Sequence, residues 1–369
     1  MISSTRVASP LKELARLGQS VWLDYIRRNL IASGELQRLV DDGLGGITSN
    51  PSIFEKAITG STDYAEALAR LRVGKDLDAK NIYEKLAIGD IQDAADILRP
   101  VYDRTGGRDG FVSMEVSPFL ANETDATIEE ARRLWKTIDR PNVMIKVPGT
   151  TAGLPAIEQL TSEGINVNIT LLFSQEVYEQ VALAYIRGLG KCADPAKVAS
   201  VASFFVSRID TLADSRIAEK LKAADASALS RLESLRGRVA IANAKLAYER
   251  YKRLFSGERW QKLAARGART QRVLWASTSV KNPKYRDVMY VEELIGPDTV
   301  DTIPPATLGA FRDHGEIRPT LEEGIDGARR VMADLESAGI SIKEVTDKLL
   351  VDAIHLFTES FDKLLNAVD

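Results

Sequence analysis

Cysteine and histidine are scarce in this chain of 369 residues, which contains one cysteine and two histidines. Cys192 alone cannot form an internal disulfide, and it offers no thiolate cluster for zinc or iron–sulfur. With only His314 and His355, a catalytic histidine triad or a multi-histidine metal site is nearly excluded. Any acid–base chemistry must therefore come from carboxylates, lysine or hydroxyl groups, and we expect no metal site.

Long apolar runs and a strong net charge are also missing. Residues 1–18 contain no apolar segment of the kind found in a secretion signal, and no stretch approaches the ~20 apolar residues that a membrane span needs. The net charge is 49 − 52 = −3, which argues against nucleic acid or an anionic membrane as the main partner. Together with the single cysteine, these features predict a cytoplasmic protein.

The sequence does contain a regular alternation of short strand-like and helical segments. Eight β-rich runs occur, at residues 20–25, 46–50, 111–116, 143–148, 165–171, 198–206, 272–277 and 299–304. Helical patterns separate most of them, for example over 33–43, over 174–190, and from a capping box at Thr127 and Glu130 to just before Pro141. This alternation predicts an α/β protein whose parallel sheet closes into a (β/α)8 TIM barrel.

No linker rich in proline, glycine or serine interrupts the chain, so we expect a single barrel domain over residues 1–369. Ser9 as a cap, Pro10 and Gly18 mark a helix that precedes the first strand. Helices over 320–338 and 342–366 are expected to pack on the outside of the barrel. The sequence leaves open the oligomeric state and the role of the helical region 211–260.

Polar side chains follow seven of the eight predicted strands at their carboxyl ends, where a barrel of this type has its active site. Any one of them alone is commonly a capping or turn residue. Their recurrence on so many strands indicates a site instead. In strand order they are Asp24, Asn50, Glu115, Lys146, Asn168 with Thr170, Ser203 with Arg208, and Ser277 with Lys281.

Lys146 is the most informative of these residues because it lies within the apolar run VMIKVP (143–148). Such a lysine is directed to the barrel interior or its mouth, unless it extends its ammonium group to water. An amine in a partly desolvated site can attack a ketone to form a Schiff base. The protonated imine then lets a neighbouring carbon–carbon bond break, and Asp24 and Glu115 can move the protons that this requires.

The other polar residues suit a sugar phosphate. Asn50 and Asn168 supply neutral hydrogen bonds for the hydroxyls of a short ketose fragment. A phosphate ester can be held by groups from the sixth and seventh strands. These groups are Ser203, Arg208, Ser277 and Lys281.

Five segments of the chain resemble the transaldolase family, in the same order along the sequence. They are GITSNPSIF (46–54), SMEVSP (113–118), MIKVPGT (144–150), INVNITLLFS (165–174) and ASFFVSRID (202–210). The resemblance extends from about Leu17 to about Thr307, and the surrounding segments are similar to the longer bacterial branch of the family. KVPGT and TSNPS are specific in combination, whereas either alone would be weak.

The resemblance implies a cofactor-free transferase of the pentose phosphate pathway. Such enzymes move a dihydroxyacetone unit from sedoheptulose 7-phosphate to glyceraldehyde 3-phosphate, which yields erythrose 4-phosphate and fructose 6-phosphate. Lys146 would be the Schiff-base lysine and Asp24 the acid/base at the cleaved bond, while Glu115 and Thr170 would hold a catalytic water. The implied substrate contacts are Asn50 and Asn168 for the dihydroxyacetone hydroxyls, Arg208 and Ser277 for phosphate, and Phe205 at the aromatic position near the site.

One position departs from the family pattern. Much of the family has an arginine two residues after the seventh-strand serine, whereas ASTSVKNP (276–283) places Ser279 there and Lys281 slightly later. Either residue could replace that arginine. Two alternative functions stay open: a fructose 6-phosphate aldolase, against which Phe205 and Glu115 argue, and a barrel that binds sugar phosphates without turnover, against which Lys146 and Asp24 argue.

Overall fold

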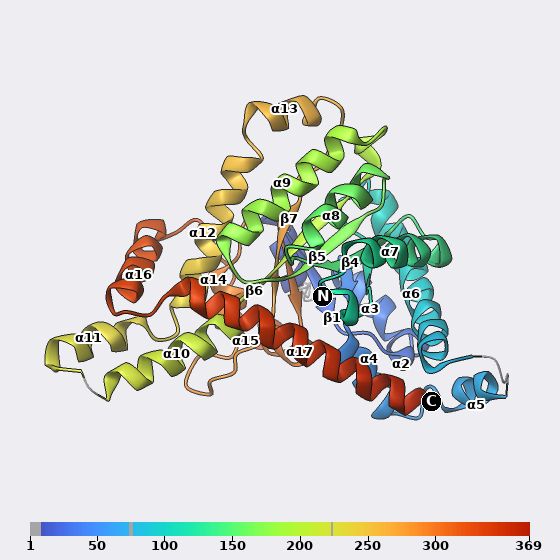
Figure 1. Cartoon of the computed structure of the whole chain (residues 1–369), viewed down its shortest axis with the longest axis horizontal. Helices are drawn as coiled ribbons and strands as arrows, with labels where there is room; N and C mark the ends of the chain where they lie inside the picture. The colour runs from blue at the N-terminus through green and yellow to red at the C-terminus, as the bar shows by residue number, and fades with distance from the viewer. Residues whose placement is uncertain (1–8, 74–76, 223) are drawn as a thin grey trace, which may run out of the picture.

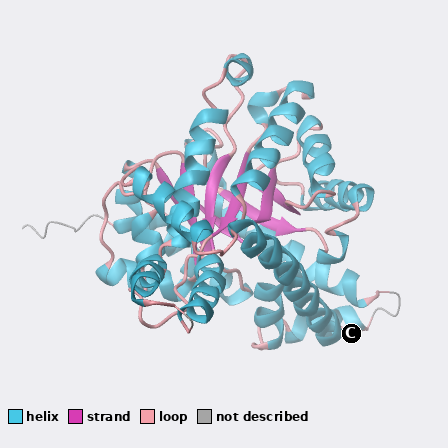
Figure 2. Cartoon of the chain, turned by 60° about the vertical axis from the view of Figure 1, so that its left-hand side comes forward, coloured by secondary structure: helices cyan, strands magenta, loops and turns pink. Residues whose placement is uncertain are grey.

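The fold is a closed barrel of eight parallel strands surrounded by helices (Figures 1 and 2). The computed structural model describes residues 9–73, 77–222 and 224–369. Neighbouring strands pair in chain order, and β8 closes on β1. The predicted (β/α)8 barrel is confirmed, and every strand end lies within two residues of its predicted position. The strands are β1 (Gln19–Asp24), β2 (Gly46–Thr48), β3 (Phe111–Glu115), β4 (Val143–Pro148), β5 (Val167–Leu172), β6 (Ser200–Phe205), β7 (Arg272–Ala276) and β8 (Thr299–Ile303).

Helices form the layer around the barrel, and some connections between strands carry more than one helix. Within the described ranges, no helix is both long enough and apolar enough to span a bilayer. The helices are α1 (Pro10–Arg16), α2 (Arg28–Ala32), α3 (Glu35–Asp42), α4 (Pro51–Thr59), α5 (Ala65–Arg72), α6 (Ala79–Arg104), η1 (Pro118–Leu120), α7 (Thr124–Ile138), α8 (Gly153–Ser162), α9 (Gln175–Lys191), η2 (Pro195–Lys197), α10 (Ser207–Leu221), α11 (Ala226–Leu235), α12 (Val239–Leu254), α13 (Glu258–Ala264), α14 (Met289–Glu293), α15 (Pro305–His314), α16 (Ile325–Ser337) and α17 (Ile342–Val368).

The register of three neighbouring strands brings polar side chains to one height. Glu115 on β3 pairs with Lys146 on β4, and Lys146 pairs with Asn168 on β5. Residues directly opposite each other in a sheet project to the same face. All three side chains are buried, so they share the interior of the barrel near the carboxyl ends of the strands.

A polar cluster closes the amino-terminal end of the barrel. Asp109, just before β3, accepts hydrogen bonds from Trp22 Nε1 at 2.7 Å and from Ser20 Oγ. The buried guanidinium of Arg272 donates to Ser20 Oγ at 2.7 Å and lies 3.4 Å from the Asp109 carboxylate. Because a buried charge is stable only when it is paired and hydrogen-bonded, these groups depend on one another.

The predicted helix caps were only partly right. Ser174 caps α9, since its Oγ accepts hydrogen bonds from two backbone amides of the first turn. Ser9 precedes α1 but donates its hydroxyl to a carbonyl of α3 instead of capping. Thr127 lies inside α7, and the Glu130 carboxylate accepts a hydrogen bond from Ser117 N at 2.6 Å. The capping box was therefore wrong, because tertiary partners use the side chains that would have formed it.

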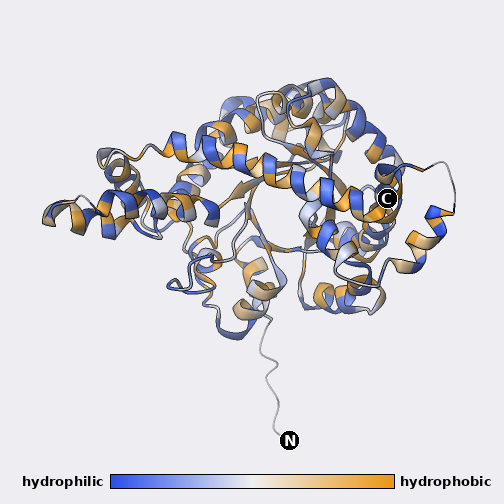
Figure 3. Ribbon diagram, turned by 60° about the horizontal axis from the view of Figure 1, so that its bottom comes forward, coloured by the Kyte–Doolittle hydropathy of each residue, from blue (hydrophilic) through white to orange (hydrophobic). Residues whose placement is uncertain are grey.

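The C-terminal helix α17 packs outside the strands, as predicted, but it runs across the mouth of the barrel, which the sequence did not indicate. It crosses the molecule diagonally, packs on α4 and α6, and contacts α10 near its other end (Figure 1). Its hydropathy alternates along its length (Figure 3), and its buried face includes Phe357 and Phe361. Ser360 on this helix accepts a hydrogen bond from Ser52 of α4 at 2.7 Å. An amphipathic helix must cover its apolar face, and here α4 and the barrel mouth cover it.

Gly46 at the start of β2 pairs with Trp22 of β1 on one side and with Phe111 of β3 on the other. A β-carbon there would lie 2.7 Å from the Trp22 ring and 2.8 Å from the carbonyl oxygen of Phe111. Overpacking of this kind costs ~1–3 kcal/mol. We therefore expect Gly46→Ala to lower the free energy of unfolding by about that amount, measured by urea unfolding.

Gly89→Ala is the matched control, because a β-carbon at that position of α6 would contact nothing within 4 Å. Replacing glycine by alanine in an open helical position should raise stability by ~0.5–1 kcal/mol. An unchanged unfolding midpoint for Gly46→Ala would contradict this expectation, because it would show that Trp22 and Phe111 can move away from the added methyl group without loss of stability.

Candidate active site

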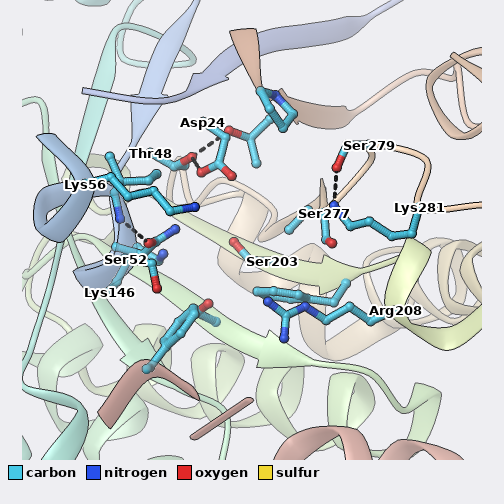
Figure 4. Close-up of a pocket in the computed structure, with 18 residues that line it drawn as sticks. Asp24, Thr48, Ser52, Lys56, Lys146, Ser203, Arg208, Ser277, Ser279 and Lys281 are labelled. Atoms are coloured by element: carbon cyan, nitrogen blue, oxygen red, sulfur yellow. Dashed lines mark hydrogen bonds between the residues drawn. The ribbon is translucent and has the colours of Figure 1, made fainter. Parts of the chain in front are cut away.

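A cavity of about 250 Å³ opens at the carboxyl ends of the strands (Figure 4). All of the predicted site residues line it except Glu115 and Asn168. The lining residues are Asp24, Thr48, Asn50, Ser52, Ile53, Lys56, Lys146, Thr170, Ser203, Phe205, Arg208, Ala276, Ser277, Ser279, Lys281, Thr302, Pro304 and Phe357.

Lys146 forms a buried ion pair with Glu115. Lys146 is only 4 % exposed, and its Nζ lies 3.0 Å from Glu115 Oε2. The ammonium also donates to the backbone carbonyl of Ser49 at 2.8 Å. Burial raises the pKa of Glu115, the charge of Lys146 opposes that rise, and the charge of Asp24 adds to it. Glu115 therefore contacts the lysine directly from just behind the cavity wall.

Asn168 lies behind the cavity wall and is fully buried. Its Oδ1 accepts a hydrogen bond from Ser203 Oγ at 2.6 Å, and its Nδ2 donates to Ser113 Oγ at 3.0 Å. Both ends of the amide are thus engaged by the protein. In this structure Asn168 orients Ser203, which does line the cavity, and the expected contact of Asn168 with a substrate hydroxyl stays a prediction.

Asp24 is the last residue of β1 and lines the same cavity as Lys146. Its carboxylate accepts a hydrogen bond from Thr48 Oγ1 at 2.8 Å, and Thr48 Oγ1 is 2.6 Å from Thr302 Oγ1. Burial raises the pKa of Asp24, while Lys146, the Thr48 hydrogen bond and Lys281 each lower it. A carboxyl whose pKa is raised is a stronger base, which suits an acid/base group.

Thr170 is placed by a distortion of β5. The next residue, Leu171, has φ 64°, and the pairing of β5 with β6 shifts between Ile169 and Leu172. A leucine in the left-handed region is strained by about 1–3 kcal/mol. Among the described residues, none hydrogen-bonds the buried Thr170 Oγ1, which lines the cavity. The hydroxyl is therefore available to water or substrate.

Two cations and several hydroxyls form the wall near β6 and β7 (Figure 4). Arg208 lies over the Phe205 ring, 5.8 Å from its centroid, and among the described residues no carboxylate forms an ion pair with its guanidinium. Burial lowers the pKa of Arg208. It also lowers that of Lys281, and the charges of Arg208 and Lys56 lower it further, while Asp24 opposes them. Concentrated positive charge of this kind attracts an anion.

Ser277 and Ser279 complete this wall, and Lys281 Nζ donates a hydrogen bond to Ser279 Oγ. Ser277 has φ 57°, and its Oγ lies 3.0 Å from Ser207 Oγ at the start of α10. Strained backbone often accompanies functional residues. Both candidates for the replaced family arginine, Ser279 and Lys281, therefore reach the cavity.

Comparison with known proteins identifies relatives along nearly the whole chain. Residues 21–368 match the family described as transaldolase/fructose-6-phosphate aldolase. "Transaldolase 2" of Nostoc sp. is 50% identical over 97% of this chain and 96% of its own length. "Transaldolase" of Trichodesmium erythraeum is 49% identical over 98% and 97%, and "Transaldolase 1" of Streptomyces avermitilis is 47% identical over 100% and 97%.

The chain belongs to the transaldolase family. The resemblance noted from five short segments is thereby confirmed. Family membership carries over no residue role by itself, so the roles assigned to individual side chains remain predictions that rest on the geometry above.

The sequence did not indicate eight of the residues that line the cavity of this transaldolase-family chain, among them Ser52, Lys56 and Phe357. Ser52 and Lys56 lie one turn apart on α4, whose first residue directly follows Asn50. Residues four apart on a helix share one face, so the spacing of Ser52 and Lys56 is a signal that they face the same way. The sequence did not show that α4 lies over the barrel mouth, so this signal could not be used. Phe357 comes from α17, and no local pattern links it to the strand ends.

In the part of the chain that the structure describes, no group of three or more His, Cys, Asp and Glu side chains is arranged to hold a metal ion. The ammonium of Lys146 occupies the space beside Glu115, where a cation would otherwise be attracted. The cavity thus contains the Lys146 amine, with the Glu115 carboxylate 3.0 Å from its nitrogen and Asp24 in the cavity lining.

Proposed function

We propose that this chain is a transaldolase, which transfers a dihydroxyacetone unit from sedoheptulose 7-phosphate to glyceraldehyde 3-phosphate. The observation that supports this most is a buried lysine paired with Glu115 in a cavity that Asp24 also lines. The far wall of this cavity carries Arg208 and Lys281, and neither forms an ion pair with a carboxylate of the described residues. The full-length relatives named transaldolase support the same reaction.

The first step uses Lys146 as the nucleophile. Its neutral amine attacks the C2 ketone of the donor, and the resulting carbinolamine loses water to form an iminium ion. Glu115 lies 3.0 Å from this nitrogen, and the Thr170 hydroxyl, which no described residue hydrogen-bonds, lines the same cavity. These positions support a role for the two residues in moving the proton and holding the water. The imine then accepts electrons from the bond that breaks.

Asp24 acts at the bond between C3 and C4. It takes the proton of the C4 hydroxyl, the C3–C4 bond breaks, and erythrose 4-phosphate leaves as an aldehyde while an enamine stays on the lysine. The enamine carbon attacks the aldehyde carbon of glyceraldehyde 3-phosphate, and Asp24 returns its proton to the new hydroxyl. Water then hydrolyses the iminium, which releases fructose 6-phosphate and restores Lys146.

The phosphate of donor and acceptor is assigned to Arg208, Ser277 and Lys281. Guanidinium and ammonium groups with nearby hydroxyls are the usual ligands of a phosphate dianion. The cytoplasmic location, the single-domain organisation, and the absence of a cofactor or of nucleic-acid and membrane partners stay predictions.

Lys146 should carry the covalent intermediate. With fructose 6-phosphate present, borohydride should trap a three-carbon adduct on this residue, located by peptide mass mapping. Lys146→Ala and Lys146→Arg should be nearly inactive, since arginine keeps the charge but supplies no nucleophile. An adduct mapped to any other lysine would overturn the assignment.

The acceptor distinguishes transfer from the aldolase alternative. With fructose 6-phosphate and erythrose 4-phosphate together, a transaldolase forms sedoheptulose 7-phosphate. Release of free dihydroxyacetone as the main product would identify a fructose 6-phosphate aldolase instead. If fructose 6-phosphate binds but no product forms, the protein binds sugar phosphates without converting them.

Replacing Asp24 and replacing Glu115 should slow different steps of the reaction. We expect Asp24→Asn to slow carbon–carbon cleavage by ~10²–10⁴, the usual range for a positioned acid/base, while imine formation continues. Glu115→Gln should slow imine formation and hydrolysis. Rapid-quench borohydride trapping measures the imine, and product release measures cleavage. Wild-type trapping kinetics in both variants would contradict this division.

Removing a phosphate ligand should affect only phosphorylated substrates. A hydrogen bond to a charged group contributes ~1.5–3 kcal/mol, so Arg208→Ala should raise the KM for fructose 6-phosphate by about 10–100-fold. The slow reaction of unphosphorylated fructose should be nearly unchanged. Lys281→Ala should behave likewise but more weakly, and a loss for Arg208→Ala alone would assign the second contact to Ser277 and Ser279.

Lys262→Ala is the control for this comparison, because Lys262 lies on the exposed face of α13 and pairs with a residue of its own helix. It should leave both substrates unaffected. Equal losses on phosphorylated and unphosphorylated donors in Arg208→Ala would mean that the arginine supports the fold and not the phosphate.

A further inference from the structure

The segment that follows β7 carries part of the proposed phosphate site but belongs to no strand or helix. Residues 277–288 lie between β7 and α14, and Ser277 and Lys281 line the cavity. Much of this segment is exposed. Irregular exposed segments are usually mobile unless other elements hold them, so a preformed anion site here requires anchors.

Tyr285 provides the first anchor. Its hydroxyl donates to Asp214 Oδ2 of α10 at 2.5 Å, and the other carboxylate oxygen accepts from Gly237 N at 3.1 Å. Gly237 lies between α11 and α12 with φ 68°, and a β-carbon there would lie 2.8 Å from the tyrosine ring. The ring therefore packs directly on the junction of these two helices.

Tyr290 provides a second anchor of the same form. Its hydroxyl donates to Asp210 Oδ2 at 2.9 Å, and Asp210 Oδ1 accepts from Ala240 N of α12 at 2.8 Å. Asp210 and Tyr290 are both almost fully buried. In each pair, one carboxylate oxygen accepts a hydrogen bond from α12 or the turn before it. The other accepts from a tyrosine, which is Tyr285 within the segment or Tyr290 just beyond its end.

Both aspartates lie on the helix that also carries Arg208. Arg208 is the second residue of α10, and Asp210 follows two positions later. The same helix start binds the other end of the segment, because Ser207 N donates to Ser277 O at 3.0 Å. One rigid element thus holds the arginine and fixes both ends of the segment that carries Lys281.

We propose that Asp210 and Asp214 are positioning residues that hold the segment after β7 against α10 through Tyr290 and Tyr285. This keeps Ser277 and Lys281 at a fixed place relative to Arg208, so that one phosphate can contact all three. It gives the helices within 211–260 a role: the α11–α12 junction supports the anion site from behind. The inference rests on the proposed phosphate site.

The test removes single hydroxyl groups. Tyr285→Phe and Tyr290→Phe delete the donors and keep the rings. We expect each to raise the KM for fructose 6-phosphate, and the inhibition constant of inorganic phosphate, by about three- to tenfold. The turnover number with saturating donor, the reaction of unphosphorylated fructose and borohydride trapping on Lys146 should stay within about twofold of wild type.

Tyr185→Phe is the matched control. The Tyr185 hydroxyl donates to Arg269 O at 2.9 Å, and its ring belongs to a separate apolar cluster around α9 and α13. This variant loses a comparable hydrogen bond but should leave the KM for fructose 6-phosphate and the phosphate inhibition constant unchanged. Equal effects in all three variants would show a general loss of stability and overturn the inference.

Arg208→Ala, measured in parallel, separates the two claims. If Arg208→Ala weakens phosphate binding and both tyrosine variants do not, the phosphate site stands and the positioning role is wrong. If Arg208→Ala has no selective effect either, the phosphate site itself is misplaced and both proposals fall. Wild-type phosphate inhibition in Tyr285→Phe and Tyr290→Phe therefore overturns the inference in every case.

Discussion

The ammonium of Lys146 lies inside the barrel, and the arrangement around it follows from the need to satisfy that charge. Glu115 and the carbonyl of Ser49 contact the nitrogen directly, at 3.0 Å and 2.8 Å. Removing one partner of such a buried pair costs about 3–5 kcal/mol, because the other charge is left without compensation. Glu115 and Lys146 stay in contact only while β3 and β4 keep the register that pairs them.

Register is what the barrel contributes to the site. Glu115, Lys146 and Asn168 are direct neighbours across β3, β4 and β5, so a slip of one residue would turn their side chains away from the interior. The hydrogen bonds from Ser203 to Asn168 and from Asn168 to Ser113 link further strands at the same level. Polar groups that are buried and fully hydrogen-bonded specify one arrangement more strongly than apolar packing does.

Elements added to the basic barrel complete the cavity. α4 and α17 cover the mouth and bring Lys56 and Phe357 to it, while α10 to α12 hold the segment after β7. The left-handed conformations of Leu171 and Ser277 occur at two of the positions that line or adjoin the cavity. Such strain persists only where the surroundings determine the backbone, and the added helices supply those surroundings around Ser277.

The sequence by itself determined the barrel, since its alternation of short β-rich runs with amphipathic helices leaves few other ways to bury the apolar faces. It also indicated Lys146, because a charge inside the run VMIKVP must face the interior or its mouth. Only the tertiary structure decided that Asn168 lies behind the wall, that Thr127 does not cap a helix, and that α17 crosses the mouth. These features depend on contacts between residues far apart in the chain, such as Ser52 with Ser360 and Ser203 with Asn168. Local propensity and spacing contain no information about which distant partner a side chain will meet, because that choice is made only when the helices pack.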